Sequence, residues 1–301
     1  DLSSTKAWHS VPLSIRYRNG TFYNFPPPSQ GLYTLSALNA LNFVKLAAIE
    51  NGGADYFHHL AEAVNAQLRP RNRHLCDPAS GTLNLQWLLS RERAAADYAA
   101  IDPQVAVPWQ ETGKPADPAW LAATDASGRT AGRRQSLFHD FGSGCMVGDT
   151  GILWLNRAAG FTPGSAHANS WAPGKLPANT LNPSAWLADD GHQCYFGSQG
   201  GDGQPQTQMV LATQLIDYQK GIDQALQAPR FLQGRSFFGS SENLKLEKSI
   251  PHAVGEALTR RGHEIEWIPE LSPFTGLAGA VAIHPDGRRE AMHDPRGEGT
   301  A

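Results

Sequence analysis

Cysteine is scarce in this sequence, and the three residues present lie far apart. Cys76, Cys145 and Cys194 are odd in number and show no C-x-x-C spacing. Neither a disulfide framework nor a zinc site built on cysteine is therefore indicated, and buried free thiols are the better interpretation.

Long apolar runs and long basic runs are also absent. No stretch approaches the roughly 20 apolar residues that a membrane span needs, and the first residues, DLSSTKAWHS, lack the basic start and apolar block of a targeting signal. The net charge is -3, and the longest basic runs are the arginine pairs at 133–134, 260–261 and 288–289. We therefore expect no nucleic-acid and no membrane partner. The composition is typical of a soluble protein, of either the cytoplasm or the periplasm.

Several catalytic signatures are missing as well. There is no G-x-S-x-G elbow, no G-x-G-x-x-G and no Walker lysine, which disfavours an α/β-hydrolase and a phosphate-binding loop. No H-E-x-x-H or facial spacing occurs among the histidines at 58, 59, 192, 252 and 263. The sequence predicts no metal and no cofactor.

The elements that are present indicate an α+β protein. Asn19-Gly20 separates two β-rich runs and predicts a hairpin. Proline-rich residues 101–118 read as a linker or surface loop, and from residue 120 to about 200 we expect strands to dominate. Predicted helices cover about 31–46, 54–68, 84–100, 205–218 and 250–260; predicted strands include 13–17, 21–25, 120–124, 186–188, 192–196, 244–247, 264–268 and 278–283. Strands and helices mix without βαβ alternation, which favours a layered sandwich.

Three segments, in their order and spacing, resemble the γ-glutamyltranspeptidase family of N-terminal-nucleophile (Ntn) hydrolases. They are PPPSQG at 26–31, FGSG at 141–144 with GDTGILWLNR at 148–157, and GKLPANTLNP at 174–183 with GSQGGDGQPQTQ at 197–208. Shorter matches follow at APR (228–230), RGHE (261–264) and DPR (294–296). Each segment is weak alone, but together they extend over nearly the whole chain. The resemblance is strongest to the branch that includes oxamate amidohydrolases.

The resemblance implies an αββα sandwich of which this chain is the C-terminal half, with the N-terminal part missing. Residues 1–117 then correspond to the end of the family's large subunit, and residues 118–301 to the small subunit. It also implies a small-molecule amide or carboxylate as ligand. Strand edges without neighbours would pair with the missing N-terminal segment or with a second copy of the chain.

The GSQGGDGQ loop carries the clearest chemistry. Glycines between a strand and a helix let backbone N–H groups point at one spot, where they stabilise an oxyanion. By resemblance, Gly200 and Gly201 are the family's oxyanion-hole glycines. The alternative from the residues alone is a tight turn that binds no ligand.

Four more positions correspond to substrate-binding residues of the family. Asn179 and Thr180 stand where short polar side chains hold the substrate carboxylate, although a polar loop that caps a turn accounts for them nearly as well. Ser136 stands where a small polar residue lies near the nucleophile. Gly160 replaces the aspartate that receives the α-ammonium in transpeptidases, which argues against the usual recognition of glutamyl groups.

The largest departure from the family is at position 118. Counting back from FGSG through the turn at 125–128 places the family's catalytic threonine there, and this sequence has Pro118. That threonine supplies a hydroxyl nucleophile and, once freed, an α-amine base. Because proline has no hydroxyl, we expect an uncut chain and an impaired amidohydrolase or acyltransferase. The alternatives are an unrecognised nucleophile, or a non-catalytic small-carboxylate-binding or scaffold protein of the same fold.

Overall fold

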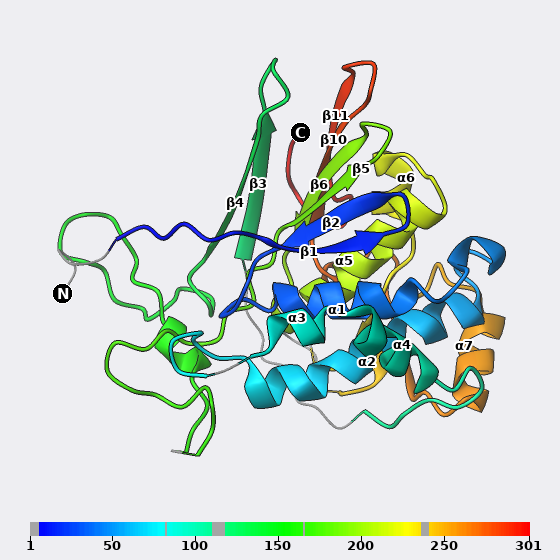
Figure 1. The fold of residues 1–301 in the computed structure, drawn as a ribbon, viewed down its shortest axis with the longest axis horizontal. Helices are drawn as coiled ribbons and strands as arrows, with labels where there is room; N and C mark the ends of the chain where they lie inside the picture. Colours follow the sequence, from blue (N-terminus) through cyan, green and yellow to red (C-terminus); the bar gives the residue numbers. More distant parts are fainter. Residues whose placement is uncertain (1–5, 82, 110–117, 165, 236–240) are drawn as a thin grey trace.

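A six-stranded antiparallel sheet forms the centre of the computed structural model, which describes residues 6–81, 83–109, 118–164, 166–235 and 241–301. The strand order is β1-β2-β5-β6-β10-β11 (Figure 1). The strands are β1 (Leu13–Tyr17), β2 (Gly20–Asn24), β5 (Ser184–Ala188), β6 (Gln193–Ser198), β10 (Ala278–Ile283) and β11 (Arg289–His293). Residues from both ends of the chain therefore share one sheet. The predicted first hairpin is present, but its two loop residues are Arg18 and Asn19, since Gly20 is the first residue of β2 and pairs with Tyr17.

Helices cover one face of this sheet in two layers (Figure 1). Helices α1 (Gly31–Leu41) and α5 (Gln204–Ala212) pack on the sheet, and α2 (Ala54–His74) packs beneath them. The remaining helices are α3 (Leu85–Leu88), α4 (Arg91–Ala99), α6 (Ile222–Gln227) and α7 (His252–Arg260). A small sheet of β7 (Phe231–Gln233), β8 (Leu244–Glu247) and β9 (Ile265–Ile268) flanks them. No helix in the described ranges is long and apolar enough to cross a bilayer.

A separate hairpin lies against the other face of the sheet. It consists of β3 (Pro118–Thr124) and β4 (Thr130–Ser136). The Trp120 ring packs over Gly197 of β6 and Gly279 of β10, where a Cβ added to Gly279 would lie 2.8 Å from the ring. Only glycine leaves room for this indole, so these two positions allow the hairpin to approach the sheet. The result is a helix–sheet–hairpin layering, and the predicted α+β class is confirmed.

The structure corrects two of the predicted elements. The helix predicted at 84–100 is interrupted between α3 and α4, where Ser90 accepts a hydrogen bond from Arg93 N and begins a new helix. The described residues of 137–183, where strands were expected to dominate, contain turns, a short 3-10 helix at Arg157–Gly160 and two isolated bridges, Met146 with Leu153 and Asn179 with Ser29. The glycines of this segment adopt positive φ values that interrupt strand pairing, namely Gly142, Gly144, Gly148, Gly151, Gly164 and Gly174.

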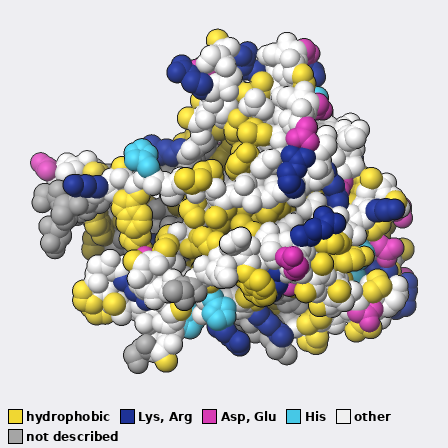
Figure 2. All heavy atoms as spheres, viewed as in Figure 1, with side chains coloured by type: hydrophobic (Ala, Val, Ile, Leu, Met, Phe, Trp, Pro, Cys, Tyr) yellow, Lys and Arg dark blue, Asp and Glu magenta, His cyan; other side chains and the backbone are white. Residues whose placement is uncertain are grey.

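Large hydrophobic side chains are exposed on the hairpin and on the segment that follows it. Those more than a third exposed in this region are Leu121, Phe141, Met146, Ile152, Trp154, Leu155 and Trp171. Figure 2 shows hydrophobic side chains gathered across the middle of one face, below the hairpin, and on the long loop to the left. Apolar patches of this kind are characteristic of surfaces that contact another protein segment.

Candidate active site

The loop between β6 and α5 turns through two glycines in the left-handed region. Gly200 has a φ of 109° and Gly201 a φ of 52°, values that strain residues with side chains. Gln199 N donates to Leu277 O at 2.7 Å, which fixes the loop to the segment before β10. Within the described part of the chain, the N–H groups of Gly200 and Gly201 have no hydrogen-bond acceptor. Two free backbone donors on one tight turn can receive a developing oxyanion.

Buried polar side chains hold this loop against α1 and α2. Gln30, just before α1, donates from Nε2 to Gly201 O and to Thr180 O, both at 2.9 Å. Arg71 of α2 donates from Nη1 to Gln30 Oε1 and to Asp202 Oδ1, both at 2.8 Å. The PPPSQG segment thus contributes through its glutamine, which joins the glycine loop to the segment that contains Thr180.

Asn179 and Thr180 lie directly beside this network. Asn179 N donates to Pro28 O at 2.7 Å, and Gln30 N donates to Asn179 O at 2.8 Å. The side-chain oxygen of Asn179 accepts from Leu181 N at 2.9 Å. The Asn179 side chain therefore caps its own loop, as the alternative interpretation of the sequence expects, while its amide nitrogen remains available to a ligand.

A cavity of about 230 Å³ lies beside the glycine loop. Three of the four predicted substrate-binding residues, Gly160, Asn179 and Thr180, line it, and so does Asp202, the residue after Gly201. The other lining residues are Gln30, Arg71, Asn72, Leu75, Phe138, Arg157, Thr162, Asn169 and Ala178. The cavity therefore collects residues from segments that are more than 150 positions apart in the sequence.

Arg157 is a cavity residue to which the sequence motifs assigned no role. Its guanidinium lies 4.2 Å from the centre of the Phe138 ring and donates from Nη2 to Ala178 O. Its Nε is buried and has no acceptor in the described part of the chain. Burial lowers the pKa of Arg157 to about 10, with Asp202 opposing the shift, so the side chain remains a cation at neutral pH.

Gly160 is the reason that Arg157 fits into the cavity. A Cβ added at position 160 would lie 3.2 Å from both Nε and Nη2 of Arg157. The Asn169 side chain connects the two segments beside Arg157, because it donates to Gly160 O at 2.8 Å and accepts from Ala178 N at 2.9 Å. The absence of a side chain at position 160 leaves space that the Arg157 guanidinium fills.

A second arginine, Arg134, lies between the hairpin and β6. Its Nη2 donates to Ser198 O and to the side-chain oxygen of Gln204, the first residue of α5. Its Nε and Nη1 are buried without a partner among the described residues, and burial lowers its pKa to about 9. Arg134 therefore places positive charge next to the start of the glycine loop.

The hairpin register locates Pro118 and Ser136. They stand opposite each other at the open end of the hairpin, and Trp120 stands opposite Arg134. Arg134 donates a hydrogen bond to Ser198 O at the end of β6, just before the glycine loop. The start of β3, which pairs with this part of β4, therefore lies near the glycine loop. This is the lower end of β3 in Figure 1. Ser136 Oγ accepts from Phe138 N at 2.8 Å, and Phe138 lines the cavity.

Comparison with known sequences identifies the family. The sequence model of the γ-glutamyltranspeptidases matches residues 1–301. This chain belongs to the γ-glutamyltranspeptidase family. The resemblance seen in the motifs is thereby confirmed.

Named relatives show how much of a family member is present. The oxamate amidohydrolase proenzyme of Klebsiella pneumoniae is 38% identical over 301 residues, which are all of this chain and 57% of the relative. The glutathione hydrolase-like YwrD proenzyme of Bacillus subtilis is 34% identical over 301 residues, which are again all of this chain and 57% of the relative. The crystal structure of cephalosporin acylase from Bacillus halodurans has a TM-score of 0.83 and 28% identity, and the match covers 95% of this chain and 51% of the acylase. The chain thus spans about half the length of the relatives that it matches.

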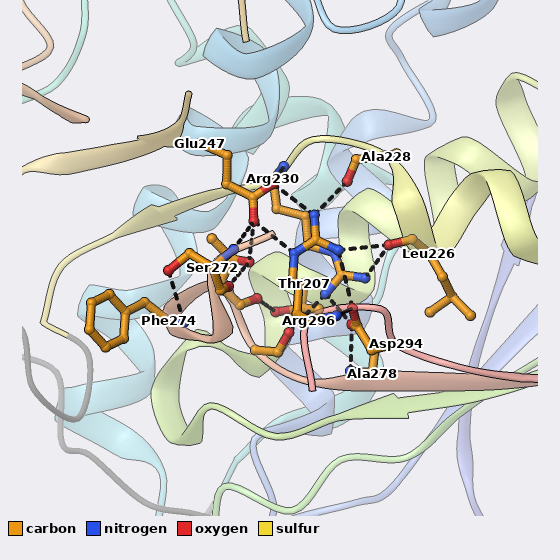
Figure 3. A network of polar contacts seen from close by, with 12 residues as sticks. Thr207, Leu226, Ala228, Arg230, Glu247, Ser272, Phe274, Ala278, Asp294 and Arg296 are labelled. Atoms are coloured by element: carbon orange, nitrogen blue, oxygen red, sulfur yellow. Dashed lines mark hydrogen bonds and ion pairs between the residues drawn. The ribbon is translucent and has the colours of Figure 1, made fainter. Parts of the chain in front are cut away.

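Two of the shorter family-like motifs, APR and DPR, contribute to a buried ionic network (Figure 3). Arg230 Nη1 donates to Asp294 Oδ2 at 2.6 Å and to Gly276 O at 2.8 Å. Gly276 in turn abuts the loop, since a Cβ added at Gly200 would lie 3.5 Å from Gly276 Cα. Arg296 binds Glu247 through two contacts of 2.7 Å. All four charged side chains are fully buried.

Proposed function

We propose that this chain carries the ligand-binding part of an Ntn amidohydrolase site for a small carboxylate-bearing amide of the oxamate type, and that Pro118 leaves the site without its nucleophile. The observation that carries the proposal is Arg157, which lines the cavity beside Gly160 and whose buried Nε has no acceptor in the described part of the chain. A buried guanidinium with an unused donor is suited to a ligand carboxylate. We further propose that the boundary between residues 117 and 118 divides the ligand-holding region from the nucleophile region.

The charges that line the cavity support a ligand without an ammonium group. Arg71 and Arg157 contribute two positive charges, and Asp202, which pairs with Arg71, contributes one negative charge. Arg157 therefore has no carboxylate partner of its own within hydrogen-bond distance among the described residues. An α-ammonium would meet an excess of positive charge there, whereas a carboxylate would neutralise it.

In the proposed binding mode, the amide carbonyl accepts hydrogen bonds from Gly200 N and Gly201 N, and the ligand carboxylate accepts from Arg157. A threonine at position 118 would attack the carbonyl carbon with its hydroxyl oxygen while its α-amine takes the proton. The leaving amine would depart with that proton, and water would then release the acid. Pro118 has no hydroxyl, so the sequence of steps stops at binding.

The second candidate is a non-catalytic small-carboxylate-binding protein of the same fold. The same features of the cavity favour it, because binding needs only Arg157 and the glycine loop. Turnover separates the two candidates: an impaired enzyme releases ammonia from oxamate slowly, and a binding protein releases none.

We predict that oxamate raises the melting temperature of the chain in a concentration-dependent way, while γ-glutamyl-p-nitroanilide has a smaller effect. Ligands that bind only the folded state stabilise it by mass action, and the oxamate carboxylate matches Arg157, which has no carboxylate partner among the described residues. Differential scanning fluorimetry gives the shift, and ammonia release is followed in the same samples. Fast oxamate turnover by the wild-type chain would contradict the assignment of Pro118.

Arg157→Gln is expected to weaken oxamate binding about 10- to 100-fold. A hydrogen bond to a charged group contributes about 1.5–3 kcal/mol, and each 1.4 kcal/mol corresponds to about tenfold in affinity. Gly160→Asp should have a similar effect, because a carboxylate at position 160 would pair with Arg157. The matched control is Arg133→Gln, which changes an exposed arginine on the adjacent hairpin. Equal affinity in all four proteins would remove Arg157 from the site.

We also propose self-association, or docking of another segment of the protein, through the exposed apolar side chains near the hairpin. Leu121, Phe141 and Trp171 are 59%, 79% and 69% exposed, and burying such side chains against a partner releases water from apolar surface. We predict that Leu121→Lys with Phe141→Lys lowers the apparent mass in light scattering at high protein concentration. A monomeric wild-type chain at all concentrations would be incompatible with self-association.

A further inference from the structure

Two histidines and a glutamate meet in the interior, away from the cavity. His58 and Glu62 are one helical turn apart on α2, and His263 follows α7. All three are buried, and their ligand atoms lie within 4.8 Å of one another. Arg71 of the cavity is nine residues beyond Glu62 on the same helix, about 14 Å along its axis. The cluster is therefore separate from the candidate active site.

Hydrogen bonds fix the tautomer of His58. Its Nε2 lies 2.8 Å from Asp102 O, and because a carbonyl oxygen can only accept, Nε2 carries the proton. The lone pair of His58 is therefore on Nδ1, which lies 2.9 Å from His263 Nε2. A histidine that donates one ring N–H to a backbone carbonyl and presents the other nitrogen inward has the orientation of a metal ligand.

Glu62 is a buried carboxylate that lacks a cation. Its Oε2 accepts from Val107 N at 3.2 Å, and no lysine or arginine among the described residues pairs with it. It is only 4% exposed. Buried carboxylates are normally paired with a positive charge or coordinate a metal. Burial raises the pKa of the Glu62 carboxyl group to about 7, and a positively charged ligand would hold this group in its charged form.

We propose that His58 Nδ1, His263 Nε2 and a Glu62 oxygen bind one divalent transition-metal ion, with Zn²⁺ as the best match. Two imidazoles and one carboxylate are a common three-residue ligand set for zinc, with the fourth position taken by water. Metal–ligand bonds of about 2.0–2.2 Å place neighbouring ligand atoms about 3.3 Å apart in a tetrahedral site. The two rings therefore need to separate by only a few tenths of an ångström, and the ring proton of His263 moves from Nε2 to Nδ1 so that Nε2 presents its lone pair.

The position of the site indicates what the ion would do. The ion would join the first half of α2 to the turn after α7. Two of its ligands are also hydrogen-bonded to the segment 102–107, His58 to Asp102 O and Glu62 to Val107 N. Ion binding would therefore stabilise the packing of α2, the helix that supplies Arg71 to the cavity. The sequence analysis predicted no metal here, because the proposed ligands come from two segments about 200 residues apart.

Titration of the metal-free protein with Zn²⁺ tests the proposal. We expect one ion per chain by isothermal titration calorimetry, a higher melting temperature with Zn²⁺, and a visible absorption band when Co²⁺ replaces Zn²⁺. Glu62→Gln and His263→Gln should each weaken binding at least about tenfold, as the loss of a ligand or its support does in other sites. Their melting temperatures without metal show that the variants are folded.

The matched control is His192→Gln, which removes an exposed histidine that lies 3.0 Å from Asp190. It should bind Zn²⁺ as the wild-type chain does. The proposal is overturned if the wild-type chain binds no ion at this stoichiometry. It is also overturned if Glu62→Gln and His263→Gln, in folded form, bind as tightly as the wild-type chain, or if binding disappears in His192→Gln.

Discussion

Replacing Pro118 by threonine is expected to produce a chain that cuts itself between Asp117 and residue 118 and then hydrolyses oxamate slowly. The threonine supplies the hydroxyl that attacks the preceding carbonyl and later the substrate. The two free N–H groups of Gly200 and Gly201 are already in place, and one such donor contributes on the order of 3 kcal/mol to the transition state. We expect oxamate turnover at least about 100-fold above that of Pro118→Ala, with oxamate preferred over γ-glutamyl compounds.

The wild-type chain provides the baseline for this experiment. Its intact mass should remain that of one polypeptide after long incubation at neutral pH, where the acid-labile Asp117–Pro118 bond is stable. Mass spectrometry and ammonia release are measured for all three proteins, expressed with any residues that the gene encodes before Asp1. A folded Pro118→Thr variant that neither cuts itself nor hydrolyses oxamate would show that position 118 is not the nucleophile site or that the site has lost more than one residue.

The sequence predicted those parts of the fold that local interactions determine. The first hairpin and the turn at 125–128 form because short loops fix the strand register on their own, although the first loop is Arg18-Asn19, one residue before the predicted Asn19-Gly20. The sequence predicted that this helix ends at about residue 68, whereas α2 continues through Pro70 to His74. Burial of Leu68 and Arg71 against neighbouring segments keeps this last part helical despite the proline.

The site was predictable where its residues lie in contiguous motifs. Gly200 and Gly201 were singled out from their neighbours, and the structure brings Asn179, Thr180 and Gly160, which their motifs singled out, to the lining of one cavity. The roles of these residues stay a prediction. Arg157 was within a motif but had no assigned role, because its position in the cavity depends on the space beside Gly160, which has no side chain. That relation exists only in three dimensions.

Residues that meet through tertiary packing gave no signal in the sequence. Arg71 reads as one of several arginines near the end of a helix, yet it is the one that binds both Gln30 and Asp202. The DPR and APR segments matched the family without indicating that their charges meet. Their ion pair joins positions 230 and 294, and only the folded chain brings these together.

Asp294→Asn is expected to lower the free energy of unfolding by about 3–5 kcal/mol, the range for removing one partner of a buried ion pair. Arg230, Arg296, Asp294 and Glu247 are balanced in charge and fully buried. The substitution leaves one guanidinium without a counter-charge in the interior. Urea unfolding at neutral pH gives the difference, and Asp189→Asn, which removes the carboxylate from an exposed pair with Arg16, should leave the unfolding midpoint unchanged.

The same network predicts how stability depends on pH. Burial alone would raise the pKa of Asp294, but Arg230, Arg296 and the N–H groups of Ala278 and Arg296 outweigh it and hold the pKa below its usual value. A carboxyl group with a lowered pKa in the folded state stabilises the protein fully above its unfolded pKa of about 4. This stabilisation is lost as the pH falls through the folded pKa. The stability difference between wild type and Asp294→Asn should therefore be constant from about pH 6 to 8 and shrink in acid, and a difference that grows below pH 4 would contradict the assigned charges.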